Sequence, residues 1–273
     1  MKLITRHMPG FALVALLVVF STLPGTASSA SIDADRPTVL VTGANRGIGL
    51  AFAEHYVAAG WNVLAAVRTP ESATDLNALA DSYEHLVIEQ LDVTDNERIA
   101  ALAAAYSGTP IDVLINNAGV YGGIESQSWG TMDPSTFHQV FAVNVLAPMK
   151  MAEAFADHVA ASEQKKIVSI TSGAGTVSSE GRPGGGIFYS VSKAALNMAM
   201  RQIRAELDSR DVVVALIAPG LVDTDMLAVA RPALVSQANT PAQSVAGIAA
   251  VIEDLDESYD GRPRNYDGSV IPW

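Results

Sequence analysis

The chain has 273 residues, of which 49% are hydrophobic and 17% are charged. This composition supplies a sizeable core and excludes a disordered or fibrous protein. The chain contains no cysteine, which excludes disulfide scaffolds, thiolate zinc sites and cysteine nucleophiles. Its formal net charge of −12 argues against a nucleic-acid partner, because an acidic surface repels a phosphate backbone.

Residues 1–30 have the pattern of a secretory signal peptide. Lys2 and Arg6 precede the apolar run Phe11–Phe20, and the small residues Ala27–Ala30 follow it. A membrane span needs about 20 apolar residues, so no stable span is expected beyond this leader. If the leader is cleaved, the protein is exported to the periplasm or secreted. The alternatives are an uncleaved membrane anchor, or a start codon assigned too early in a cytoplasmic protein.

From Thr38 onward, short β-branched runs alternate with helical patterns. The runs are nearly continuous in apolar residues, which is typical of parallel strands buried on both faces. Strands are predicted at Thr38–Thr42, Trp61–Val67, His85–Leu91, Ile111–Asn116, Lys166–Thr171 and Val212–Ile217. Helices are predicted at Ile48–Ala59, Asn96–Tyr106, Ser135–Ala161 and Tyr189–Ser209. No linker divides residues 36–273, so we expect one α/β domain: a single doubly wound parallel sheet with helices on both faces and ligands at the carboxyl ends of its strands.

Three glycines, Gly43, Gly47 and Gly49, stand between the first predicted strand and the helix that follows it. Glycine permits positive φ and a close approach of backbone to phosphate, and the amino end of the helix adds N–H donors and a positive dipole. In this position the turn predicts a dinucleotide site, whereas the alternative is a turn that binds nothing. The site also takes in other residues of the same turn, namely Asn45, Arg46 and Ile48.

The end of the second predicted strand bears on the choice of cofactor. Folds that bind NAD place an acidic residue about 20 residues past the glycine turn, where it holds the ribose 2′-hydroxyl. No acidic residue occurs between Glu54 and Glu71, and Arg68 follows the strand instead. A guanidinium group pairs well with a phosphate, so Arg68, with Arg46 on the other side, favours NADP(H) over NAD(H). The alternative is that Arg68 is a solvated surface residue.

Tyr189 and Lys193 open the last predicted helix at positions i and i+4. Because these positions share a helix face, the ammonium group can lie near the phenolic oxygen and favour phenolate, as general acid–base catalysis requires. This spacing alone is common and can arise by chance on a solvated helix. Ser172, however, follows the fifth predicted strand at the same edge of the sheet, and Asn144 lies within the predicted helix Ser135–Ala161.

Taken in order from residue 38 to 225, these motifs and the spacing Gly-x-x-x-Gly-x-Gly resemble the short-chain dehydrogenase/reductase family. The segments Lys193–Asn197 and Asn265–Trp273 are similar, more narrowly, to the C-factor and sniffer-type carbonyl reductases. The resemblance implies a Rossmann fold, a small-molecule carbonyl or alcohol substrate, and a homodimer or homotetramer. The glycine-rich stretch 181–186 and the leader depart from the family pattern.

The resemblance also implies roles for individual residues. Tyr189 is the expected acid or base, Ser172 holds the substrate oxygen, and Lys193 holds the nicotinamide ribose and lowers the pKa of Tyr189. Asn144 is expected to hold a water molecule that relays protons. The expected cofactor contacts, besides the glycine turn, Arg68, Tyr189 and Lys193, are Asp92, Val93, Asn116, Ala118, Gly119, Pro219, Gly220, Val222 and Thr224.

The sequence therefore predicts an NADP-dependent oxidoreductase that interconverts a carbonyl compound and an alcohol. The alternatives are a non-catalytic nucleotide-binding signalling or sensor protein on the same fold, and a lyase or epimerase. The predicted lid, Leu221–Thr240, is rich in apolar residues and favours an apolar or small neutral carbonyl compound. The five histidines lack the spacing of metal ligands, so no metal is expected.

Overall fold

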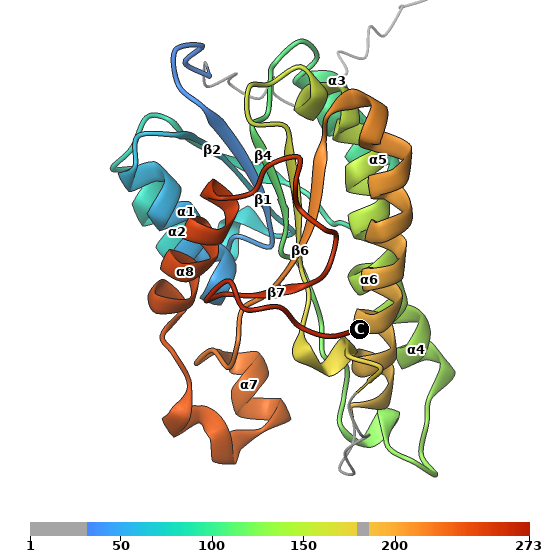
Figure 1. Ribbon diagram of the computed structural model, residues 1–273. Coiled ribbons are helices and arrows are strands. Elements are labelled where there is room, and N and C mark those ends of the chain that lie inside the picture. Colours follow the sequence, from blue (N-terminus) through green and yellow to red (C-terminus); the bar gives the residue numbers. More distant parts are fainter. Residues whose placement is uncertain (1–31, 179–185) are drawn as a thin grey trace, which may run out of the picture.

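The computed structural model describes residues 32–178 and 186–273 (Figure 1). The predicted leader at residues 1–30 and most of the glycine-rich stretch 181–186 lie outside the described residues. The described chain forms a seven-stranded sheet in the order β3-β2-β1-β4-β5-β6-β7, and neighbouring strands all run parallel. The strands are β1 (Thr38–Thr42), β2 (Asn62–Val67), β3 (Leu86–Gln90), β4 (Val113–Asn116), β5 (Lys166–Ile170), β6 (Val213–Ala218) and β7 (Arg264–Asn265).

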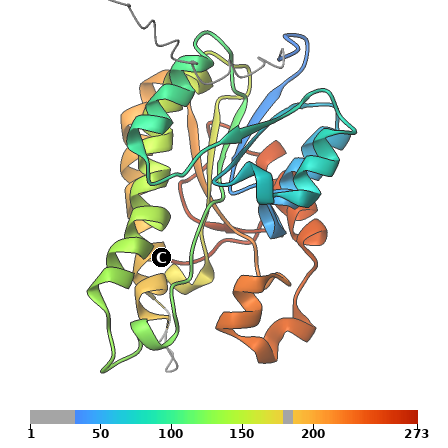
Figure 2. The same cartoon turned by 180° about the vertical axis from the view of Figure 1, so that it is seen from behind.

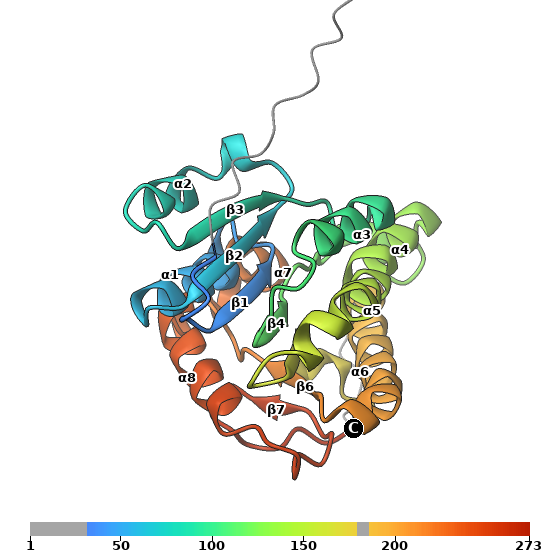
Figure 3. The ribbon, with the colours of Figure 1, turned by 90° about the horizontal axis from the view of Figure 1, so that it is seen from above.

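Two layers of helices cover the sheet, one on each face (Figure 3). One layer holds α1 (Gly47–Ala58), α2 (Thr74–Ala80) and α8 (Pro241–Glu253), and the other holds α3 (Asn96–Ala105), α5 (Ala147–Ala160) and α6 (Ile187–Leu207). A hydrophobic core lies between the sheet and each helix layer, and alternate residues of β1 point into the two cores. Val39 and Val41 pack against the first layer, and Leu40 packs against the second. This arrangement confirms the doubly wound α/β fold and the six predicted strands.

One predicted helix is interrupted. Instead of a continuous helix over Ser135–Ala161, the chain forms α4 (Pro134–Phe141), a π-helical turn η3 (Ala142–Leu146) and then α5. The cause is Pro148, near the start of α5, which lacks the N–H that an α-helix would direct to the carbonyl four residues earlier. Within η3 the chain widens, and the Ala147 N–H bonds the Ala142 carbonyl, five residues back.

The carboxyl ends of the strands lead into the loops at the lower end of Figure 1, where α7 (Asp225–Ala230) and α4 also lie. Figure 2 shows the same end of the molecule from behind. Short helical turns shape these loops: η1 (Pro70–Ser72), η2 (Glu125–Gln127), η4 (Gly173–Gly175) and η6 (Pro232–Gln237). Among the residues that the structure describes, no helix combines the length and the apolar character needed to cross a membrane.

Candidate active site

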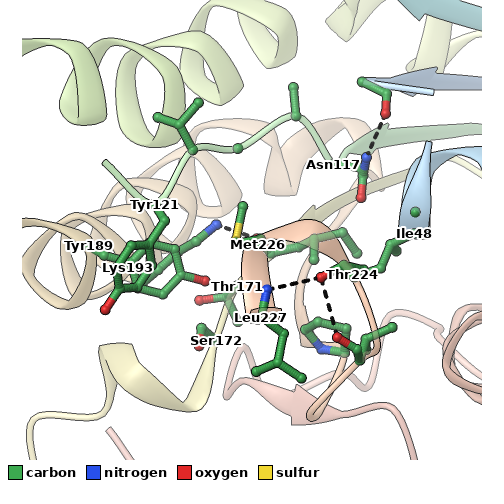
Figure 4. A pocket seen from close by; sticks show the side chains of 18 of the residues that line it. Ile48, Asn117, Tyr121, Thr171, Ser172, Tyr189, Lys193, Thr224, Met226 and Leu227 are labelled. Atoms are coloured by element: carbon green, nitrogen blue, oxygen red, sulfur yellow. Dashed lines mark hydrogen bonds between the residues drawn. The ribbon is translucent and has the colours of Figure 1, made fainter. Parts of the chain in front are cut away.

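A cleft of about 1190 Å³ runs along the carboxyl ends of β1 to β6. Its walls are the glycine turn, the segments that follow the other strands, and the first turns of α6 and α7. An open α/β sheet binds its ligands at this edge, where the strand order reverses between β1 and β4. The cleft therefore lies where the fold predicts a site, and Figure 4 shows part of its lining.

The glycine turn brings bare backbone to the floor of the cleft. Gly43 and Gly47 have φ of +69° and +56°, a region that side chains with a Cβ rarely adopt. At Gly49 a Cβ would lie 2.1 Å from the Gly43 carbonyl oxygen, so only glycine fits there. The first turn of α1 has neither an acidic residue nor a side-chain cap. Its free N–H donors and positive dipole suit an anion such as a pyrophosphate.

Arg68 and Asp92 lie on the wall at the ends of β2 and β3. Asp92 accepts hydrogen bonds from the hydroxyl (2.7 Å) and the N–H (2.9 Å) of Thr94. The hydroxyl bond is the main cause that lowers the pKa of Asp92, and the positive charge of Arg68 adds to it. Arg68 is exposed, so its guanidinium group remains accessible to a ligand in the cleft.

Arg46, in the glycine turn, reaches across the cleft to the first residue of α7. Its Nη1 lies 2.9 Å from the Asp225 carboxylate, and both side chains are largely exposed. The sequence predicts that Arg46 approaches a cofactor phosphate. The structure places it in the cleft wall as predicted, but with a carboxylate already beside its charge.

The structure brings Ser172, Tyr189 and Lys193 together at one end of the cleft (Figure 4). Ser172 follows β5 and caps η4, since its hydroxyl oxygen accepts the Ala174 N–H at 3.1 Å. Tyr189 and Lys193 lie one turn apart on α6, with the Lys193 Nζ 5.8 Å from the centre of the Tyr189 ring. That ammonium group donates a hydrogen bond to the Ile170 carbonyl at 2.8 Å.

Burial governs the protonation of both ionisable groups. It raises the pKa of Tyr189, an effect to which the neighbouring Tyr121 adds and which a hydrogen bond with Ser172 opposes. Burial also lowers the pKa of Lys193 to about 8. Burial dominates the shift in the pKa of Tyr189, and the expected lowering of that pKa by Lys193 is not among its causes. The phenol is therefore protonated at neutral pH.

Two predicted site residues lie outside the cleft lining. The Asn144 side chain, buried in η3, accepts the Val120 N–H and donates to the Val120 carbonyl and the Ser192 hydroxyl, so its amide is occupied by protein groups. Asn116 turns its side chain toward the Pro148 carbonyl and Ser169, between the sheet and α5. Asn144 thus holds the segment after β4 against α6, while the side chain of Asn116 belongs to the interior.

All other predicted cofactor and catalytic residues line the cleft. The structure adds several that the sequence did not single out. Asn117 directly follows Asn116, and its amide donates to the carbonyl oxygens of Thr42 and Gly43, which ties β4 to the glycine turn. Further such lining residues are Tyr121 and Val143, whereas Met226 and Leu227 belong to the predicted lid, Leu221–Thr240. Within residues 32–178 and 186–273, no cluster of His, Asp and Glu could hold a metal ion.

Comparisons with known proteins agree with this geometry. The family model described as short chain dehydrogenase matches residues 37–234. The NADPH-bound carbonyl reductase from chicken fatty liver is 32% identical, with a TM-score of 0.79 over 87% of this chain and 100% of that one. Carbonyl reductase Sniffer of D. melanogaster is 25% identical, with a TM-score of 0.77 over the same shares of the two chains. C-signal of Myxococcus xanthus is 35% identical over 168 residues, which are 60% of this chain and 93% of C-signal.

Proposed function

Because the chain belongs to the short-chain dehydrogenase family and is an oxidoreductase of that family, we propose that it interconverts a carbonyl compound and an alcohol with NADP(H), with Tyr189 as acid and base. The observation that carries this proposal is the meeting of Ser172, Tyr189 and Lys193 in the same cleft as the glycine turn. A nucleotide-binding protein without chemistry has no need of these three groups beside the cleft.

The cleft fits a dinucleotide with a 2′-phosphate. The glycine turn and the open amino end of α1 suit the pyrophosphate, and glycine at position 49 lets the start of α1 pack directly against the Gly43 carbonyl. Arg68 would meet the 2′-phosphate, and no carboxylate stands in its place after β2. Thr224, Pro219 and Val222 would line the nicotinamide end. When bound, NADPH supplies the hydride that adds to the carbonyl carbon.

The residues of the chain manage the proton. Tyr189, protonated because burial raises its pKa, gives its phenolic proton to the carbonyl oxygen as the C–H bond forms, which leaves an alcohol. Ser172 donates a hydrogen bond to the same oxygen and holds it beside the phenol. Lys193, fixed by the Ile170 carbonyl, places a positive charge where the phenolate develops. In the reverse direction, the Tyr189 phenolate accepts the hydroxyl proton of the alcohol.

The lining also favours a substrate class. Apolar side chains from three segments line the cleft, namely Val143, Val177, Leu221, Met226 and Leu227. These groups cannot stabilise a charge, whereas they remove apolar surface from water. The proposed substrate is therefore an aldehyde or ketone with a neutral, apolar body.

The test is NADPH oxidation with a panel of neutral aldehydes and ketones, followed by absorbance. We expect Tyr189→Phe to lower kcat by at least about a hundredfold, since it removes the proton donor, while NADPH still binds. Tyr83→Phe removes a phenol outside the cleft and is the matched control, expected to keep the wild-type rate. Equal rates in wild type and Tyr189→Phe would end the proposal.

The similarity to C-signal supports a second candidate function, that of a nucleotide-binding signalling protein. Wild-type protein that binds NADPH but turns over no carbonyl compound supports that alternative. A substrate converted without net NADPH consumption supports a lyase or epimerase instead. The NADPH oxidation assay, combined with a titration of NADPH binding and an analysis of the substrate for conversion, therefore separates the three.

A further inference from the structure

A buried glutamine joins the segment after β4 to the start of α6. Gln127, the last residue of η2, has a side chain that is 0% exposed. Its Nε2 donates to the Tyr121 carbonyl at 2.7 Å, and its Oε1 accepts the Tyr189 N–H at 3.1 Å. The side-chain amide therefore bonds the main chains of two tyrosines that are far apart in sequence.

The bond to Tyr189 replaces a missing helix cap. Tyr189 is the third residue of α6, and the first N–H groups of a helix have no partner within it. The residue before α6 is Gly186, which has φ of +83° and no side chain that could cap. Gln127 supplies the acceptor from a segment 62 residues away, so it fixes the main chain that carries the proposed acid.

The bond to Tyr121 fixes the neighbouring ring. The rings of Tyr121 and Tyr189 lie with their centres 5.0 Å apart and their planes at 38°, side by side in the cleft wall (Figure 4). The Tyr121 hydroxyl fills the space beside Gly186, where a Cβ would come within 2.5 Å of it. Tyr121 is thus bonded at its carbonyl by Gln127, and its hydroxyl lies against Gly186 at the start of α6.

We propose that Gln127 is a positioning residue for the proposed reaction: its amide sets the two phenols relative to each other and thereby aims the Tyr189 hydroxyl at the substrate oxygen. The catalytic part of this inference rests on the proposed function. The inference requires a primary amide, because one end must donate and the other must accept. Leucine offers neither group, and an ionised glutamate accepts but cannot donate.

The experiment compares Gln127→Leu and Gln127→Glu with wild type. We expect Gln127→Leu to lower kcat about ten- to a hundredfold, because a small misplacement of an acid is costly, and to leave the KM for NADPH unchanged. Gln127→Glu is expected to lose activity at alkaline pH and to approach the wild-type kcat as the pH falls. The protonated carboxyl then donates to Tyr121 and accepts from Tyr189, as the amide does.

The matched control is Asn62→Leu. Asn62 is also a fully buried amide, and its Nδ2 donates to Asp33, Arg36 and Thr38 at the opposite edge of the sheet. This variant loses a comparable set of buried hydrogen bonds, so it reports what destabilisation alone does to kcat. We expect the folded fraction of Asn62→Leu to keep the wild-type kcat.

A second readout does not depend on turnover. The seven tyrosines can be replaced by 3-fluorotyrosine, and the ¹⁹F resonances of Tyr121 and Tyr189 assigned with the two Phe variants. Both resonances should move in Gln127→Leu, and neither should move in Asn62→Leu. Unmoved resonances, or a Gln127→Glu variant whose kcat relative to wild type is independent of pH, would overturn the role of Gln127. If the wild-type protein turns over no carbonyl compound, but both resonances still move in Gln127→Leu, only the proposed function is overturned.

Discussion

Burial lowers the pKa of Lys193, the lysine in the cleft wall. The pKa of Lys193 falls from 10.5 to about 8 because its ammonium group is removed from water. Below pH 8 the folded protein carries the full cost of this buried cation. Between pH 8 and 10.5 the unfolded chain binds more protons than the folded one, so the free energy of unfolding rises with pH over that window.

Replacing this lysine should therefore stabilise the protein while disabling it. At neutral pH we expect Lys193→Met to raise the free energy of unfolding by about 1 to 3 kcal/mol, the gain from removing the charge less the lost hydrogen bond to Ile170. The advantage should shrink as the pH rises from 8 to 10.5. Urea unfolding at neutral and alkaline pH measures it, with Lys150→Met as a half-exposed control. A variant less stable than wild type at neutral pH contradicts the prediction.

Arg68 should decide between the two nicotinamide cofactors. A guanidinium bonded to a 2′-phosphate contributes the energy of a charged hydrogen bond, so we expect Arg68→Ala to raise the Kd for NADPH by about ten- to a hundredfold. The Kd for NADH, which lacks that phosphate, should not change. Fluorescence titration gives both constants, and Arg210→Ala, which breaks an ion pair with Asp157 outside the cleft, is the control. An unchanged Kd for NADPH would reduce Arg68 to a solvated surface residue.

At the scale of elements, α7 and the glycine turn meet through Arg46 and Asp225. The carboxylate partly neutralises the arginine that the sequence assigns to the cofactor. We therefore expect Asp225→Asn to tighten NADPH binding by about two- to fivefold, the magnitude of an exposed ion pair, and to leave the stability of the fold nearly unchanged. The gain should fade at high salt and should vanish when Arg46 is also replaced by Ala. Weaker NADPH binding by Asp225→Asn would show that the pair instead holds α7 over the cofactor.

The same scale shows which elements a sequence can predict. The strands β1, β2, β4, β5 and β6 are mostly apolar runs buried on both faces, and that pattern sets their bounds to within about two residues. The edge strand β3 is only partly buried and ends in Glu89 and Gln90, but its apolar start still reveals it. β7 has two residues, Arg264 and Asn265, and no apolar pattern to reveal it. The π-helical turn η3 is also hard to predict, because all of Ala142–Leu146 except Asn144 is apolar and continues the helical pattern; only Pro148 marks the interruption.

The site residues also divide into those that the sequence can predict and those that it cannot. The glycine turn, Ser172, Tyr189 and Lys193 are predictable because local spacing carries their chemistry, and the sheet then brings them to one edge. Gln127 and Tyr121 are not predictable from spacing, because their partners lie across the fold. Asn116 and Asn117 show how far sequence spacing can assign neighbouring residues to the site. Adjacent residues of an extended segment point to opposite sides, and only Asn117 turns to the cleft.

At the scale of the whole molecule, exposed apolar side chains mark the outer surface of η3 and α6. Leu146 and Met198 are 46% and 57% exposed. The expected homodimer or homotetramer would bury this surface. We expect light scattering after gel filtration to give two or four chains per particle, and Met198→Glu to shift the population toward one, because it buries a charge in the interface. A monomeric wild type at micromolar concentration contradicts the expectation.

The direction of β1 has a practical consequence. The described chain enters this strand at Thr38, at the amino edge of the sheet, and leaves it at Thr42 directly into the glycine turn. A strand of this length separates the two edges by about 16 Å, so Asp33 and Arg36, which Asn62 holds at the start of β2, lie on the side away from the cleft. Attached to a resin through Asp33, the protein would keep its cleft facing away from the support and open to small molecules that diffuse in from solution.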